Sequence, residues 1–533
     1  MSRSPAALFR TTHVVALVLC AVFLPWSTAF LSMAQMLLVV NWFAAGVHGG
    51  TMRGRLKGAF ADAPSLVFLS FFGLHLLGLL WTQDMEWGLD LVRIIVPVLS
   101  FGAVLAGSQR LSVPEFRAIM LLGAWSVVAS SIFGALFSGA VPGDYRTPSM
   151  FISHIRLVLL LCLAIVVFVW NMQRPALWVR VLYGIAILWC LYFINRLGSL
   201  QGYVILAVLA AAWWWIKAAH LRPLVRWSAR AALVLVPACL IALVALELQG
   251  RMILPAADLP FREPRSAGGE LYAHDLHDPQ QENGTHVWTH IAWQELRRTW
   301  SLRSDRSLDT PDERGHPLWA TAVRYLASKG LTKDSVGVMA LNDADVRAIE
   351  RGVANVMEGR RNTLRERFEE VLFELQLYGN KGIASGHSVA MRLEFWRTGW
   401  SIAKANAVVG VGTGDTQLAF NEAYASMGST LAPEWRLRAH NQYLTLWISF
   451  GVLGLLWSLF AWCWPAWRSR AFREPLFLAW AVIFAISCFT DDTIETQAGA
   501  TFFALYYALF VFAAPRAAVI TPAAPERAGP APR

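Results

Sequence analysis

Four ionisable residues stand at the edges of long apolar runs, where a charged side chain is costly to place. Arg156 lies in "FISHIRLVLLLCLAI", Arg196 in "FINRLGSLQGYV", Arg392 in "SVAMRLEFWRTGW" and His440 in "RAHNQYL". Arginine grips phosphate oxygens through paired hydrogen bonds and stays protonated, whereas histidine exchanges a proton near neutral pH. Such a set, if it meets in space, predicts a site for a lipid-borne diphosphate with proton transfer beside it.

The alternative is that each arginine only anchors a helix end to lipid phosphate. A single arginine would favour that interpretation, but four groups from separate segments on one predicted side favour a shared site. Arg438 and Asn441 flank His440 and join it as candidate diphosphate- or acceptor-binding residues, together with Asp415. Asp415 ends "GVGTGD" at 410–415, which we interpret as a turn after a helix, because it lacks the strand and the GK[ST] ending of a phosphate loop. There, Asp415 could instead cap the next segment.

A second polar cluster, "HDLHDPQQENGTHVWTH", contains His274, His277, His286 and His290. The HxxH and HxxxH spacings could hold zinc, although no thiolate supports such a site and no known zinc-protease order is present. The alternative is a solvated polar loop. We predict no metal and no cofactor.

The composition indicates the elements that must position these residues. Of the 533 residues, 56% are hydrophobic and only 15% are charged, which excludes an ordinary soluble protein. The net charge of +10 could suggest nucleic acid, but many arginines lie in short loops between apolar runs, so lipid is the expected partner. All six cysteines lie in apolar segments, which argues against a disulfide framework.

Apolar runs of membrane-spanning length predict an all-α polytopic integral membrane protein with about twelve transmembrane helices. They lie near 12–26, 28–47, 64–81, 89–108, 115–138, 154–171, 178–195, 198–216, 229–247, 441–463, 475–489 and 497–514. Basic loops near 53–57, 110–117, 174–180, 217–230 and 468–473 place those loops and both termini in the cytoplasm. The four charged residues and the polar segment after residue 247 then lie on the outer side.

The domains predicted from this topology are a membrane bundle of about nine helices at 1–247 and a helical insertion at 248–440. About three further membrane helices follow at 441–514, and then a disordered cytoplasmic tail at 515–533, which is rich in proline and alanine. Within the insertion, "LNDADVRAIERGVANVMEG" predicts an amphipathic helix with Asn342 as its cap. A second helix begins at the Thr363/Glu366 capping pair of "TLRERFEEVLFEL".

The blocks "MRLEFWRTGWSIAKANAVVGVGTGDTQLAFNEAY" and "WRLRAHNQYLTLWISFGVLGLL" resemble the C-terminal half of the O-antigen ligases, in the O-antigen ligase/polymerase superfamily. The resemblance covers most of 150–510 and implies a metal-independent, GT-C-like glycosyltransferase of lipopolysaccharide biosynthesis. Such ligases move O-antigen from undecaprenyl diphosphate to lipid A-core at the periplasmic face of the bacterial inner membrane. His440, Arg392 and Arg196 match the family's essential residues, and Arg156 matches a less widely shared motif.

The chemistry that this resemblance implies is direct attack of an acceptor hydroxyl on the anomeric carbon, which inverts that centre. Fixed arginines would stabilise the departing diphosphate, and His440 would act either as general base or as a donor to phosphate. A polysaccharide polymerase and a protein O-oligosaccharyltransferase remain alternatives that differ in the acceptor. A lipid-linked glycan transporter is less favoured, because no cluster of charges lies at mid-span.

Overall fold

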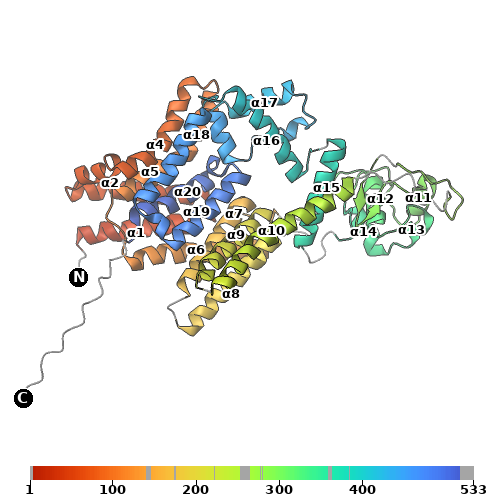
Figure 1. Cartoon of the computed structure of the whole chain (residues 1–533), viewed down its shortest axis with the longest axis horizontal. Helices are drawn as coiled ribbons and strands as arrows, with labels where there is room; N and C mark the ends of the chain where they lie inside the picture. The colour runs from red at the N-terminus through yellow and green to blue at the C-terminus, as the bar shows by residue number, and fades with distance from the viewer. Residues whose placement is uncertain are drawn as a thin grey trace, which may run out of the picture.

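The computed structural model describes residues 4–139, 146–172, 176–220, 222–252, 265–275, 278, 280–357, 363–382 and 384–515. Within these residues the chain is an assembly of helices with one two-stranded hairpin. Figure 1 shows most of the apolar helices gathered in a bundle, with α11–α14 set apart and joined to it through α10 and α15.

Ten helices of the described chain are long and apolar enough to cross a membrane, and two shorter apolar helices follow, so the predicted all-α polytopic fold is confirmed. The ten are α1 (Pro5–Phe23), α2 (Thr28–His48), α4 (Ala63–Gly78, extended to Trp81 by a short turn), α5 (Met85–Ala106), α6 (Val113–Phe137), α7 (His154–Asn171), α8 (Leu177–Arg196), α9 (Leu200–Ala218), α10 (Pro223–Met252) and α18 (Gln442–Arg468). The two shorter ones are α19 (Pro475–Thr490) and α20 (Gln497–Ala508), the latter continued to Ala513.

The centre of the bundle is formed by helices that are apolar on every side. Helix α7 is buried along almost its whole length, and every residue of α20 from Gly499 onward is buried. A helix that is hydrophobic all round belongs inside other helices rather than at their edge. Arg156, in the first turn of α7, is therefore held at the end of the innermost helix.

One helix lies in a segment that we predicted as a basic loop. Helix α3 (Met52–Phe60) carries Arg53, Arg55 and Lys57 and buries only Ala59. Its nine residues are too short and too polar to give the apolar periodicity on which the prediction relied.

Helix α18 is broken at Gly451, which adopts φ +65°. The loop after α16 (Ser388–Ala405) fills the break, where the amides of Val411 and Gly412 donate to the carbonyls of Ile448 and Ser449 at 2.9 Å. Backbone groups freed by a break in a membrane helix need such partners, because lipid supplies none. Glycine is required here because it tolerates positive φ and leaves room for the loop.

The insertion has its own hydrophobic core, built by α11 (Trp293–Trp300), α12 (Leu318–Ser328), α13 (Ser335–Met339) and α14 (Asp343–Glu350). Strands β1 (Gln281–Glu282) and β2 (Thr285–His286) pair in antiparallel register beside α12. The predicted cap at Asn342 is confirmed, since its side chain accepts from the Asp345 amide. Helix α14 stops at Glu350, short of the predicted stretch, because the chain turns at Gly352 with φ +84°.

The part of the polar region from residue 363 onward does not belong to the hydrophobic core of α11–α14. Helix α15 (Thr363–Lys381) is the second helix predicted there, although the side chains of its expected capping pair, Thr363 and Glu366, lie outside the described residues. Helices α16 and α17 (Thr416–Ser426) share a separate core with α18. The region 248–440, predicted as one domain, thus holds two cores, the second continuous with a membrane helix. Of the predicted tail, 516–533 lie outside the described residues.

Candidate active site

A cavity of about 1630 Å³ lies between the apolar bundle and the insertion. It is lined by the start of α7, the α8–α9 connection, the insertion, α15, the start of α16 and the loop before α18. Two of the residues singled out from the sequence, Arg392 and His440, line this cavity, and so does Thr490 at the end of α19. The cavity is large enough for an extended ligand.

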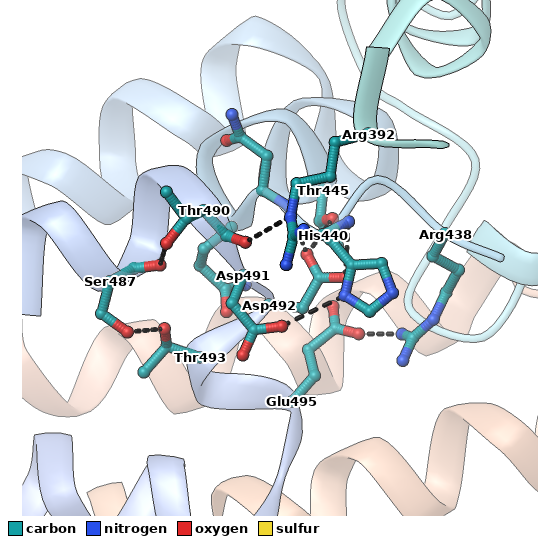
Figure 2. Close-up of polar contacts among 12 residues, drawn as sticks. Arg392, Arg438, His440, Thr445, Ser487, Thr490, Asp491, Asp492, Thr493 and Glu495 are labelled. Carbon is teal, nitrogen blue, oxygen red and sulfur yellow. Dashed lines mark hydrogen bonds and ion pairs between the residues drawn. The ribbon is translucent and has the colours of Figure 1, made fainter. Parts of the chain in front are cut away.

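His440 is held by two acids from the connection between α19 and α20. Its ring Nδ1 lies 3.1 Å from Oδ1 of Asp491, and Figure 2 shows the ring facing that carboxylate. Nε2 forms no hydrogen bond with any described residue. A carboxylate at Nδ1 favours the tautomer with the proton on Nδ1, which leaves Nε2 free to accept one.

The backbone at His440 is strained, with φ +45° for a residue that carries a Cβ. A left-handed conformation costs about 1–3 kcal/mol in such a residue and persists only where the surroundings enforce it. Asp492 does so, because its carboxylate accepts from the amides of His440 and Asn441 at 3.1 Å and from the Thr445 hydroxyl at 2.7 Å. Asp492 is therefore a positioning residue for the histidine.

Behind the histidine, Arg156 and Asp491 form a buried ion pair, with side chains 9% and 4% exposed. The Arg156 guanidinium also donates to the backbone carbonyl of Asp492 at 3.2 Å. Burial alone would raise the pKa of Asp491, but the hydrogen bond from His440 and the charges of Arg156 and Arg392 hold it below its usual value. Asp491 therefore remains a carboxylate that orients the imidazole.

Arg392 projects from the first turns of α16 toward the same cluster, as Figure 2 shows. Its Nε donates to the Thr490 carbonyl at 3.3 Å and its Nη1 to the Ser388 carbonyl at 2.9 Å. These two bonds fix the guanidinium at the cavity wall. Phe395, one turn further along α16, places its ring 5.6 Å from the His440 ring.

Two further arginines predicted for the site, Arg196 and Arg438, do not line the cavity. Arg438 pairs with Glu495, and its guanidinium stacks over Trp87, with the ring centroid 5.2 Å away. Arg196 ends α8, and residues 197–201, which follow it directly, line the cavity.

The side chains of Asp415 and Asn441 accept hydrogen bonds from backbone amides. The Asp415 carboxylate accepts from the amides of Gln83 and Asp84 at 2.8–2.9 Å and so holds the turn between α4 and α5. The Asn441 side chain caps α18 by accepting from the Tyr443 and Leu444 amides at 3.1 Å. Both are buried, and neither lines the cavity. The Asp415 side chain makes no capping hydrogen bond to α17, so the structure does not show the capping alternative, and both side chains hold the backbone instead of lining the cavity.

Residues 351–459 match the family described as O-antigen ligase, a segment that contains Arg392 and His440. This segment is about a fifth of the chain, and over it the chain is similar to the O-antigen ligases. The resemblance noted in the sequence is thereby confirmed for residues 351–459. No curated protein matches the chain.

The O-antigen ligase segment does not contain every residue that the structure places in the cluster. Arg156, Asp491 and Asp492 lie outside 351–459, and the sequence analysis did not single out the two aspartates. The two aspartates lie in "TDDTIETQAG", the segment between α19 and α20. The available signal was the adjacency of two acids to the end of an apolar helix, on the predicted side of the arginines.

The histidine cluster of the insertion is organised around a lysine. His274 Nδ1 accepts from the His290 amide at 3.1 Å, and buried Lys333 donates to the His286 carbonyl at 2.9 Å. Burial and the Lys333 charge both lower the pKa of His286. Among the described residues, no group of three or more potential metal ligands gathers, and His277 lies outside them.

Proposed function

We propose that the protein is an inverting glycosyltransferase that transfers O-antigen polysaccharide from undecaprenyl diphosphate to lipid A-core. The observation that carries this proposal is the convergence of His440 and Arg392 on one large cavity, with the Arg156–Asp491 pair directly behind the histidine. The match of residues 351–459 to the O-antigen ligase family supports a reaction on lipid-linked polysaccharide. The acceptor is the part of the proposal that depends on the resemblance to ligases.

The proposed reaction begins with an acceptor hydroxyl beside Nε2 of His440. Nε2 takes the hydroxyl proton as the oxygen attacks the anomeric carbon of the donor sugar, while Nδ1–H donates to Asp491. The bond from that carbon to the diphosphate oxygen breaks, and its electron pair leaves with the diphosphate. Attack from the face opposite the leaving group inverts the anomeric centre.

Arg392 is placed to stabilise the negative charge that develops on the departing diphosphate. Fixed guanidinium groups in a site with little water do this effectively, because they need no reorganisation as the charge forms. Arg196, at the cavity edge, is proposed to assist. The carboxylate on Nδ1 favours a general base role for His440 over a donor role toward phosphate, because it directs the basic nitrogen away from Asp491.

The proposed location is the bacterial inner membrane, with the cavity on the periplasmic face. The basic loops of the sequence, including the segment that forms α3, support this orientation, because such loops remain in the cytoplasm. About nine predicted spans precede the insertion, and an odd number of spans places it on the side of the membrane opposite to the cytoplasmic N-terminus. Both lipid-borne substrates would then meet at the outer surface.

The test is reconstitution of the full chain in lipid with an undecaprenyl-diphosphate glycan and three separate acceptors: lipid A-core, a growing glycan chain, and a serine-containing protein. Transfer to lipid A-core is expected. Product only on the glycan chain would identify a polymerase instead, and product only on the protein an oligosaccharyltransferase.

The same assay tests the site residues. His440→Ala and Arg392→Ala should each lower the transfer rate by about 10²–10⁴-fold, the usual contribution of a general base or a charge-stabilising group. Arg397→Ala is the matched control, since Arg397 is an exposed arginine on the same helix. Near-normal transfer by both site variants, with correct membrane insertion, would contradict the assignment.

A further inference from the structure

The insertion supplies a cavity wall whose chemistry differs from that around His440. Two helices contribute to this wall. Helix α12 contributes positions 320, 321 and 324, together with position 317 just before it, and α15 contributes positions 370, 373, 374 and 377. Each set has the spacing of a single helix face. Both helices therefore present one side to the cavity.

Glu282, Arg324 and Asn355 form a preorganised polar network on this wall. The Glu282 carboxylate accepts from Arg324 Nε at 2.8 Å and from Asn355 Nδ2 at 2.7 Å, and its side chain is only 7% exposed. The Arg324 guanidinium lies 4.9 Å from the centroid of the Phe373 ring, so it is held from both sides. Its two terminal nitrogens form no hydrogen bond with the described residues and remain available as donors.

The network suits a polyhydroxyl ligand better than a free anion. Glu282 neutralises the charge of Arg324. Guanidinium and amide groups bind hydroxyls through several directed hydrogen bonds, and an aromatic ring offers an apolar surface to the carbon face of a sugar. Glu282, Asn355 and Phe373 all line the same cavity as Arg324.

This wall is joined to the catalytic side by packed contacts. The Phe373 ring lies edge-on to His387, with centroids 5.9 Å apart. His387 directly precedes Ser388, whose carbonyl accepts from Arg392. A saccharide resting on Arg324 and Phe373 would therefore extend through one continuous cavity toward His440.

We infer that Arg324 and Phe373, held in place by Glu282 and Asn355, form a saccharide subsite on the insertion, which recognises the hydroxyl groups of an oligosaccharide entering the reaction. The source of that oligosaccharide rests on the proposed function, because it is either the lipid A-core acceptor or the O-antigen donor. The subsite selects the substrate and takes no part in the bond exchange.

The experiment measures binding rather than transfer. Saturation-transfer NMR on the full chain in lipid nanodiscs would follow two probes, the delipidated core oligosaccharide and the free O-antigen polysaccharide. Arg324→Ala and Phe373→Leu are each expected to weaken binding of one probe by about tenfold or more, as the loss of one or two directed contacts predicts. Arg347→Ala is the matched control, because Arg347 is an exposed arginine on the insertion outside the cavity wall.

Because Arg324→Ala leaves the buried Glu282 carboxylate unpaired, the double variant Arg324→Ala/Glu282→Gln is measured alongside it. Selective loss of the core probe would identify the acceptor as the ligand, and selective loss of the O-antigen probe would identify the donor. Unchanged affinity for both probes in the double variant and in Phe373→Leu would overturn the inference, and so would absence of binding to the wild-type chain. Binding that depends on Arg324, without transfer to any acceptor, would uphold the subsite and reject the proposed reaction.

Discussion

Asp491→Asn removes the negative charge between Arg156 and His440 while keeping the side-chain size. The amide can offer an N–H to His440 Nδ1, which favours the tautomer with the proton on Nε2 and blocks that nitrogen as a base. Loss of general base catalysis costs about 10²–10⁴-fold in rate. At about 1.36 kcal/mol per factor of ten, this raises the barrier by about 2.7–5.4 kcal/mol.

The same substitution leaves a buried guanidinium without its ion partner. Breaking a buried pair from one side costs about 3–5 kcal/mol of stability. The contact from Arg156 to the Asp492 carbonyl remains, so we expect a loss near the lower end, about 3 kcal/mol. The pKa of Asp491 is lower in the folded protein than in the unfolded chain, where it is about 3.9. The ionised carboxylate therefore contributes fully to the free energy of unfolding above that unfolded pKa, and this contribution is lost as the pH falls through the lower folded pKa. The part of the stability difference that comes from ionisation of Asp491 should therefore shrink only as the pH falls below about 4.

The assay is single-turnover transfer with saturating donor and acceptor, together with thermal unfolding of the same preparations. Asp491→Glu is the companion variant, because it keeps the negative charge and changes only the length of the side chain. We expect Asp491→Glu to retain more activity than Asp491→Asn. A folded Asp491→Asn protein that transfers glycan within about threefold of the wild-type rate would refute the orienting role, since the loss of a general base is at least tenfold larger.

Three other changes have expected outcomes. Gly451→Ala should lower stability by at least about 1–3 kcal/mol in thermal unfolding, because a Cβ at φ +65° would collide with the Val408 carbonyl, whereas Gly73→Ala, where a Cβ meets nothing, should be nearly neutral. Burial lowers the pKa of Lys333 to about 8, so the unfolded chain binds more protons between about pH 8 and 10.5, and stability should rise by about 3 kcal/mol across that range. Lys333→Met should remove that increment in the same unfolding measurement. Incubation with EDTA should leave the transfer rate unchanged, and a requirement for added divalent metal would contradict the proposed arginine-based stabilisation of the diphosphate.

The helical bundle could be predicted closely because its signal is local. Each membrane helix is a continuous apolar run of bilayer length, so its existence depends only on neighbouring residues. Helix α3 and the early end of α14 were not predictable in this way. The first is short and polar, and the second depends on the turn at Gly352.

The site was predictable in part for a related reason. His440 and Arg392 stood out because charges beside apolar runs are costly, whereas Asp491 lies in a loop whose acids resemble ordinary solvated residues. Only the packing of α7 against α19 reveals that Asp491 pairs with Arg156. The contact of Asp415 with the turn between α4 and α5 was equally hidden, because the amides that it binds lie more than 330 positions away in the sequence.

The buried pair of Arg156 and Asp491 has a consequence for biosynthesis. The ribosome produces α7 long before the connection between α19 and α20, so the nascent chain carries an uncompensated guanidinium in its first half. The counterion, Asp491, is made more than 300 residues later and reaches Arg156 only when α19 packs against α7. Enzymatic competence would thus be gained in one late step, and a chain halted before that step would be inert as well as exposed to quality-control proteases.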